Sequence, residues 1–207
     1  MSYIGSKPAS KPVVASDLDP TIITGQTALS SEPASTDEFL ISDAGVLKRL
    51  DASLIGGGKI LQVLQTAKTD TFTLSTTNTW TDVTGLSQAI TPASTSNKVL
   101  VNFSIGITSN AGANSHGFKI VRGSTSIGIG DAASSRTQTT VWDYPSENHA
   151  ETQSFTFLDS PSTTSATTYK IQMYANDTAY VNRMSTDSDS DTYGRGASTI
   201  TLMEVAG

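Results

Sequence analysis

Cysteine is absent from the 207-residue sequence, and only 15% of the residues are charged, against roughly 25% in an ordinary soluble domain. Without cysteine, no disulfide scaffold, cysteine zinc site or thiolate nucleophile can form. Lysine and arginine number 13 and the formal net charge is -6, so few cations are available to neutralise phosphates and nucleic-acid binding is not expected. No run approaches the ~18 apolar residues of a spanning helix, so membrane insertion is not expected.

Hydroxyl side chains supply the polarity that charges usually provide, because the chain has 29 serines and 31 threonines. Hydrophobic residues make up 36% of the sequence and fall in alternating runs, which argues against disorder. The first eight residues lack the charged and apolar regions of a signal peptide, so synthesis in a cytoplasm is expected. The composition therefore favours a β-rich protein with a neutral surface and no enzymatic activity.

Residues 59–207 contain one strand pattern after another. Apolar and polar residues alternate through 97–108, and the alternation returns in 168–176. Shorter versions surround Phe118, Phe155 and Ile200, with turn-forming clusters between them. Eight to ten short strands at this spacing predict an all-β fold, an antiparallel β-sandwich resembling a jelly roll. We expect minimal helix.

Residues 1–58 have a different character. Segment 1–35 contains four prolines and no periodic apolar pattern, so it cannot bury a core alone and is expected to be an extended arm. Apolar residues on both sides of Asp43-Ala44-Gly45 predict a short hairpin. The triple glycine Gly56-Gly57-Gly58 predicts a hinge. The expected domains are thus an arm with a hairpin, 1–58, and a sandwich head, 59–207.

No catalytic or cofactor site is predicted. His116 and His149 lie 33 positions apart beside turn residues, and we expect both to be surface or interface residues. The glycine-rich Gly123–Gly130 lacks the Gly-Lys-Ser/Thr ending of a phosphate loop, and we expect it to form a tight turn that leads into a strand through Ile127 and Ile129.

The acidic run of Asp187, Asp189 and Asp191 has carboxylates at alternate positions, as at the start of a calcium loop. Its sixth position is Thr192 rather than glycine, and its twelfth is Ser198 rather than a bidentate acid. We therefore predict no metal site and interpret the run as a solvated loop, with a weak cation site left open.

Three aromatic residues fall in segments that otherwise have the character of loops. Aromatic rings in loops stack on sugars or anchor in partner pockets, and they also pack under loops. The candidate recognition residues are Trp142, Tyr144 and Tyr193.

Several segments resemble the tail fibres and related virion appendage proteins of tailed bacteriophages, the marine type especially. The N-terminal pieces are Gly25–Leu29, Ser35–Gly45 and Leu47–Ile55; the C-terminal pieces are Arg122–Thr125, Gly128–Ala133, Tyr180–Arg183 and Ser198–Glu204. The resemblance implies a virion protein made in the host cytoplasm, a homotrimer of heads around a threefold axis, and an arm that docks on other virion proteins. A long repetitive shaft is missing between arm and head, which favours a short fibre, a spike or a decoration protein.

The expected function is therefore that of a short tail fibre or spike that attaches the particle to a host surface glycan or protein. The alternative is a capsid decoration or cementing protein, a head fibre that stabilises the shell. A third class, a carbohydrate-cleaving spike, would need two carboxylates about 5–10 Å apart across a groove. Asp143 with Glu147 or Glu151 is the pair that could supply them, although the spacing does not require it.

Overall fold

The computed structural model describes residues 24–25, 27, 33–34, 36–44, 46–55, 59–109, 115–144 and 149–207. The chain divides into two units, Met1–Gly56 and Gly57–Gly207, which we describe separately. Most of the predicted arm, and the Gly56–Gly58 hinge, lie outside the described residues. Within the ranges given, no helix has the length and apolar character needed to cross a bilayer.

The predicted hairpin in the N-terminal unit is confirmed. Strands β1 (Glu38–Asp43) and β2 (Val46–Asp51) pair antiparallel along their whole length. Ala44 has a φ of 51°, the left-handed conformation that tight hairpin turns need, and a 3-10 helix, η2 (Ala52–Leu54), follows. Several of the apolar side chains in the hairpin are exposed: Phe39, Leu40 and Val46. A two-stranded hairpin by itself is marginally stable at best in water.

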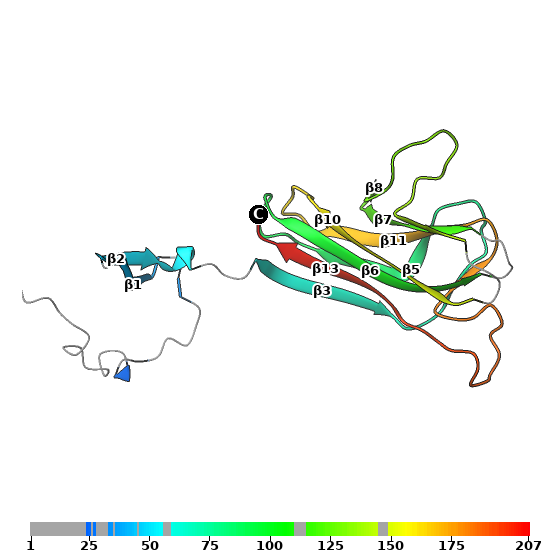
Figure 1. Ribbon diagram of the computed structural model, residues 1–207, viewed down its shortest axis with the longest axis horizontal. Coiled ribbons are helices and arrows are strands. Elements are labelled where there is room, and N and C mark those ends of the chain that lie inside the picture. Colours follow the sequence, from blue (N-terminus) through cyan, green and yellow to red (C-terminus); the bar gives the residue numbers. More distant parts are fainter. Residues whose placement is uncertain are drawn as a thin grey trace, which may run out of the picture. The chain divides into compact units, whose positions relative to one another are not determined.

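The head, residues 59–207, is a sandwich of two antiparallel sheets (Figure 1). One sheet has the order β3-β13-β6-β12-β4, with β10 on the other side of β6. Its strands are β3 (Ile60–Lys68), β4 (Phe72–Leu74), β6 (Lys98–Ser109), β10 (Glu151–Asp159), β12 (Ala179–Val181) and β13 (Ser198–Val205). The second has the order β5-β11-β7-β8, with β9 also paired to β7. Its strands are β5 (Thr81–Ile90), β7 (His116–Arg122), β8 (Thr125–Ile127), β9 (Val141–Asp143) and β11 (Thr167–Ala175). This is the predicted all-β, jelly-roll-like sandwich.

The hydrophobic core lies between the sheets, on the faces that the alternation predicted. In β6 the inward residues from Val99 to Ile107 are at most 2% exposed, and in β11 those from Tyr169 to Ala175 are fully buried. Aromatic rings from the two sheets meet in the centre, where the centroids of Phe103 and Phe118 are 6.4 Å apart. Because side chains in a strand alternate between faces, the outward residues of the same strands form two separate outer surfaces.

The two ends of the sandwich are defined by contacts within and between the sheets. At the entry end, β3 begins beside the end of β13, where Ala206 N donates to Lys59 O at 2.8 Å, and the label C in Figure 1 marks this place. Arg122 binds Asp159 across the sheets at the same end. At the distal end, Lys68 is opposite Ser198, and Asp143 of β9 reaches β10. The chain therefore joins the head at one end, opposite the end where β7 begins and β11 finishes.

The glycine-rich segment behaves as predicted in part. Gly123 has a φ of 58° and lies in the turn between β7 and β8. The strand that follows ends at Ile127, however, and does not continue through Ile129 as expected. Gly128 has a φ of 59°, and a side chain there would meet the ring of Phe157 at 3.1 Å, so the chain turns away from the sheet at this glycine.

Candidate functional site

Trp142 lies in a strand rather than in the loop that the sequence predicted. Val141–Asp143 forms β9, which pairs with β7 so that Trp142 is opposite Gly117. The neighbours of Gly117 in β7, His116 and Phe118, are buried, so Trp142 faces outward, and 43% of it is exposed. The short strand has no alternation long enough to be seen in the sequence, which explains the wrong prediction.

The absence of a side chain at Gly117 leaves space for the Trp142 indole ring to lie against β7. A Cβ atom at position 117 would lie 2.6 Å from Cε3 of Trp142 and 2.9 Å from Oγ1 of Thr139. With hydrogen there instead, the centroid of the Trp142 ring lies 5.7 Å from that of Tyr174 on β11, and Tyr174 lies 5.6 Å from Trp80 just before β5. Trp142, Tyr174 and Trp80 form a continuous band across the outer face of the five-stranded sheet, which we call the aromatic row.

Two cations lie beside the aromatic row. The Lys119 ammonium is 4.4 Å from the centre of the Trp80 ring, and partial burial lowers the pKa of this amine. Arg136, Thr137, Thr139 and Trp142 line a hollow of about 380 Å³. Within the part of the chain that the structure describes, neither Lys119 nor Arg136 has an ion-pair partner.

Polar side chains surround the rings as well. The Tyr174 hydroxyl donates to Oδ1 of Asn78 at 2.9 Å. Asp82 accepts from Gln172 at 2.7 Å and from the Lys170 ammonium at 2.7 Å. The acid on this face is therefore already compensated by a lysine, whereas the two cations nearest the rings are not.

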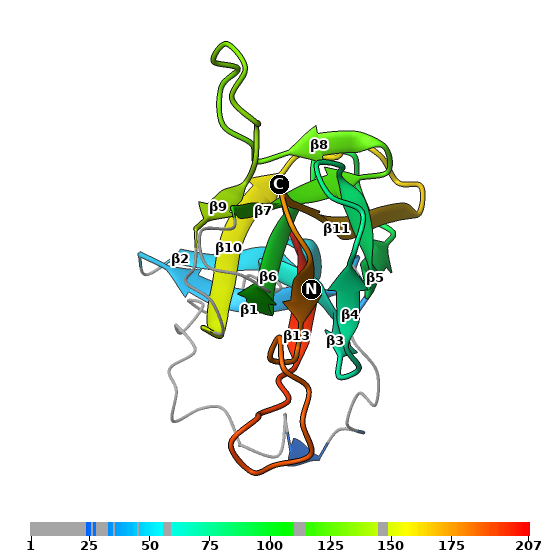
Figure 2. The same ribbon diagram turned by 90° about the vertical axis from the view of Figure 1, so that its right-hand side faces the viewer.

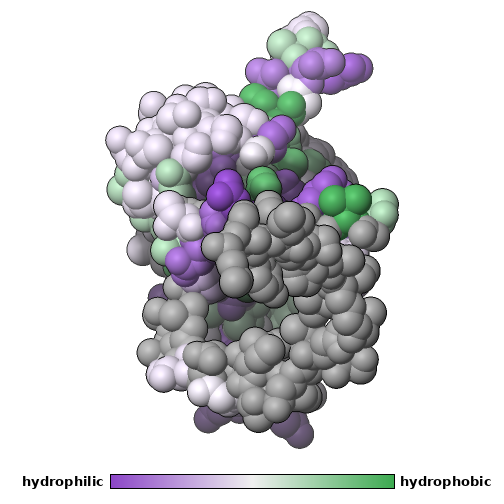
Figure 3. Space-filling view, turned by 90° about the vertical axis from the view of Figure 1, so that its left-hand side faces the viewer, coloured by the Kyte–Doolittle hydropathy of each residue, from purple (hydrophilic) through white to green (hydrophobic). Residues whose placement is uncertain are grey.

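The loop that carries Arg136 joins β8 to β9 and spans residues 128–140. Backbone and side-chain contacts hold its base together: Gly130 N donates to Thr139 O at 3.2 Å, and Gln138 Nε2 donates to Gly130 O at 2.8 Å. The loop stands out from the head in Figure 2, and in Figure 3 it forms the projection at the top, where hydrophilic and mildly hydrophobic residues adjoin.

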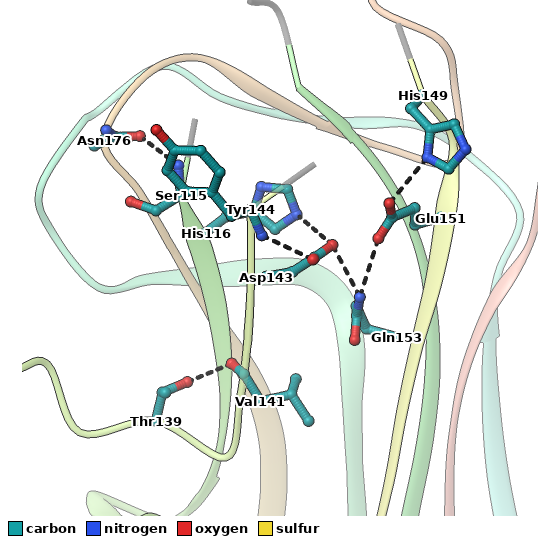
Figure 4. A network of polar contacts seen from close by, with 10 residues as sticks. All are labelled: Ser115, His116, Thr139, Val141, Asp143, Tyr144, His149, Glu151, Gln153 and Asn176. Carbon is teal, nitrogen blue, oxygen red and sulfur yellow. Dashed lines mark hydrogen bonds and ion pairs between the residues drawn. The ribbon is translucent and has the colours of Figure 1, made fainter. Parts of the chain in front are cut away.

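Behind β9, a polar cluster joins the facing edge strands of the two sheets (Figure 4). Asp143 lies 3.7 Å from Nε2 of His116 and accepts from Gln153 of β10 at 3.0 Å. Glu151 accepts from the same Gln153 amide at 3.4 Å and lies 2.9 Å from Nδ1 of His149. The cluster thus bridges β9 and β10 at the distal end.

His116 is not the surface or interface residue that the sequence predicted. Its side chain is fully buried, and neither ring nitrogen has a hydrogen-bond partner. Burial lowers the pKa of this imidazole to about 4, although the Asp143 carboxylate acts in the opposite direction. The ring is neutral at neutral pH and packs against the edge of Phe118. His149, by contrast, is 60% exposed at its side chain, as predicted.

Of the carboxyl pair proposed for a carbohydrate-cleaving spike, Glu151 lines a hollow of about 360 Å³ and Asp143 is not among the residues that line it. Asp143 and Glu151 both bind Gln153, and contact with the Asp143 carboxyl raises the pKa of Glu151. Glycosidase carboxyls about 5–10 Å apart leave space for a sugar or a water between them, and this pair is in contact instead. Glu147 lies outside the described residues.

Tyr193 and the acidic run lie on the loop between β12 and β13, residues 182–197. Asp187 binds Arg195 at 2.7 Å and approaches Arg183 to 3.6 Å, so the first carboxylate of the run closes the loop and is not aimed at a cation. Among the described residues, no group of three acidic, histidine or cysteine side chains could hold a metal. Tyr193 is 37% exposed.

The structure does not bring the three predicted recognition residues onto one surface. Tyr144 follows β9 directly and is 62% exposed, with its amide bound to Asp143. The 128–140 loop and the 182–197 loop, however, project from opposite sides of the head (Figure 2). Sequence reasoning missed Trp80, Tyr174 and Lys119. An outward-facing tyrosine among polar neighbours in 168–176 was the available signal.

The outer face of the six-stranded sheet differs from that of the five-stranded sheet in having a large area without charged residues. Strand register aligns three rows across β3, β13, β6 and β10, and none of their members is charged. The rows are Val63, Met203, Leu100 and Leu158; Gln65, Thr201, Asn102 and Thr156; and Ala67, Thr199, Ser104 and Ser154. We call these twelve residues the uncharged face. Hydrogen bonds within the second row join Gln65 to Thr201 at 2.8 Å and Asn102 to Thr156 at 2.7 Å.

No protein-family model and no curated protein matches the sequence. In three dimensions, the chain is similar to structures of infectious bursal disease virus. The structure of the Gx strain has 10% sequence identity and a TM-score of 0.41, over 80% of this chain and 41% of that chain. The VP2 subviral particle of the same virus has 10% identity and a TM-score of 0.41, over 79% and 40%. The chain thus spans about two fifths of the length of these viral chains.

Proposed function

We propose that this protein is a virion structural protein, a short tail fibre or spike whose head attaches the particle to the host cell surface. The observation that carries the proposal is the placement of the aromatic row. Trp142, Tyr174 and Trp80 lie toward the distal end, whereas the chain enters the head at the other end of the strands. A recognition surface on an appendage is useful only if it faces away from the point of attachment.

The N-terminal hairpin supplies the contact with the particle in this proposal. Its exposed apolar residues include Leu40 at 73% and Val46 at 58%, and none of the described residues of this unit is buried. A segment that cannot bury its apolar surface alone gains order by folding on a partner. The partners proposed are other virion proteins, as the resemblance to phage appendages implies.

The heads are proposed to form a homotrimer through the uncharged face. A chain with a net charge of -6 repels its own copies, and a surface without charges is where that repulsion is smallest. The face also carries apolar side chains that a monomer leaves in water: Val63 is 56% exposed and Leu158 is 46% exposed. The outer face of the other sheet, with Lys119 and Lys170, is unsuitable for the same contact.

Light scattering on the full-length chain tests the trimer. The expected mass is three times the 21.7 kDa of one chain. Lysines introduced together by Val63→Lys and Leu158→Lys are expected to reduce the mass to that of one chain, because they bury unpaired charge at the contact. Thr84→Lys, exposed on β5 of the other sheet, is the matched control and should leave the trimer intact. A monomeric wild type, or a trimer indifferent to the double substitution, would contradict the interface.

The attachment function is tested by locating the chain on the particle in an averaged cryo-electron microscopy map. Density at the tail, with the N-terminal units converging on a tail ring, is the expected result. Density distributed over the capsid lattice would instead make the protein a decoration or cementing protein, and the attachment role would have to be withdrawn.

A further inference from the structure

We propose that the aromatic row, together with Lys119 and Arg136, is a binding site for an acidic saccharide. The inference rests on the proposed attachment function and adds the chemical class of the ligand. It concerns one outer surface of the five-stranded sheet, from Trp80 at one side to the hollow under Arg136 at the other.

The rings provide the apolar part of the site. Tyrosine and tryptophan offer a flat apolar body with a polar edge, which suits the alternating C–H and hydroxyl faces of a sugar ring. Successive rings in the row are in contact, with centroids 5.6 and 5.7 Å apart and interplanar angles of 49° and 35°. Asn78 and Gln172 lie beside the rings, where hydroxyl groups of a saccharide need hydrogen-bond partners.

The charges select an acidic ligand over a neutral one. Arg136 and Lys119 have no ion-pair partner in the described part of the chain, although acids outnumber bases in this protein, 19 to 13. Asp82, an acid on this face, is compensated by Lys170. The face is therefore locally positive on a negatively charged protein, which attracts an anion and repels other parts of the same protein.

Arg136 is the better placed of the two cations for a carboxylate. Its planar guanidinium can donate two parallel hydrogen bonds to one carboxylate, and it lines the hollow whose wall is the Trp142 ring. The contacts of Gly130 with Thr139 and Gln138 hold the base of this loop, so less ordering is needed when a ligand binds. A uronic acid unit stacked on Trp142 places its carboxylate toward this hollow.

Tryptophan emission gives a direct test, because the chain has two tryptophans and both belong to the aromatic row. Wild-type protein is titrated with oligogalacturonate and a hyaluronan oligosaccharide, both acidic, and with galacto-oligosaccharide and dextran oligosaccharide, both neutral. A saturating change in emission is expected with at least one acidic probe and not with its neutral counterpart. Affinity should fall as salt is added.

Charge-removal variants assign the effect to the site. Arg136→Gln is expected to weaken binding about tenfold or more, and Lys119→Gln about as much, because each loses a charge-assisted contact. Lys98→Gln, which makes the same change of charge at the entry end, is the matched control and should bind like the wild type. Circular dichroism of each variant establishes that the head is folded.

Three outcomes would overturn the inference: no emission change with either acidic probe, equal binding of neutral probes that Arg136→Gln does not affect, or preferential binding of a single-stranded oligonucleotide. The purified chain is used throughout, so this result is separate from the location of the protein on the particle. If the protein binds the saccharide but is located on the capsid lattice, the binding site is supported and the proposed attachment function is contradicted.

Discussion

Acid is expected to destabilise the head through one buried side chain, His116. In the folded protein its pKa is about 4, against 6.5 in the unfolded chain, and each unit corresponds to about 1.4 kcal/mol. Above pH 6.5 the ring is neutral in both states and pH has no effect through it. As the pH falls below 6.5, His116 binds a proton in the unfolded chain but not in the folded one, so the free energy of unfolding falls. The loss is about 2 kcal/mol at pH 5 and approaches about 3 kcal/mol below pH 4.

Two carboxyl groups of the same polar cluster, Asp143 and Glu151, also titrate in acid. Burial, the largest single cause, raises the pKa of Asp143, but hydrogen bonds with Glu151, Tyr144 and Gln153 and the charge of His116 together lower it, so its contribution to stability is lost at acidic pH. Contact with Asp143 raises the pKa of Glu151, so protonation of Glu151 acts in the opposite direction. The contribution of the imidazole is therefore obtained from the difference between the wild type and a variant that lacks the imidazole.

The comparison uses His116→Phe, which keeps a ring in the core and removes the two unpartnered nitrogens. Urea unfolding followed by tryptophan emission, at one protein concentration, should show that the wild type loses about 2 kcal/mol more than the variant between pH 7 and pH 5. At pH 7 the variant should be at least as stable, because no buried polar atom is left unsatisfied. His149→Gln removes the exposed histidine as a control. Equal losses in wild type and His116→Phe would refute the reasoning.

Three further substitutions follow from individual contacts. Gly117→Ala places a methyl group 2.6 Å from the Trp142 ring and should change the emission of the free protein without altering its far-ultraviolet circular dichroism. Asn182→Ala removes a buried amide that donates to two backbone carbonyls at 2.8 and 3.0 Å, and should lower the urea-derived free energy of unfolding by about 2–4 kcal/mol. Asp187→Asn breaks the exposed pair with Arg195 and should cost under about 1 kcal/mol while speeding proteolysis of the 182–197 loop.

The sandwich was predictable because burial between two sheets repeats every second residue. The alternation from Val99 to Ile107 identifies a strand even when the strands that pair with it are unknown. The structure buries every residue that this pattern assigns to the core. The turn at Asp43-Ala44-Gly45 was equally local. Both features depend only on residues that are close together in the sequence.

The candidate site depends on strand register, which cannot be predicted from residues that are close together in the sequence. Tyr174 meets Trp142 because both are opposite Gly117, more than twenty positions away from each of them. Nothing near Trp142 in the sequence indicates that a glycine will lie under its ring. The prediction for His116 was wrong for a related reason: the residue begins β7, and the pairing of β7 with both β11 and β9 places it between the sheets.

The pairing of β3 with β13 has a mechanical consequence. If a bound cell holds the head at its distal end, tension from the particle enters at Ile60 and runs along the strands. Antiparallel hydrogen bonds lie perpendicular to their strands, so the ladder from Lys68 to Ile60 is loaded in shear, with its bonds sharing the force rather than breaking one after another. Survival under such a load is governed by the rate of unfolding rather than by equilibrium stability. Under the proposed attachment function, a pull between particle and cell would therefore load the β3–β13 pairing along its strands, the direction in which all of its hydrogen bonds resist together.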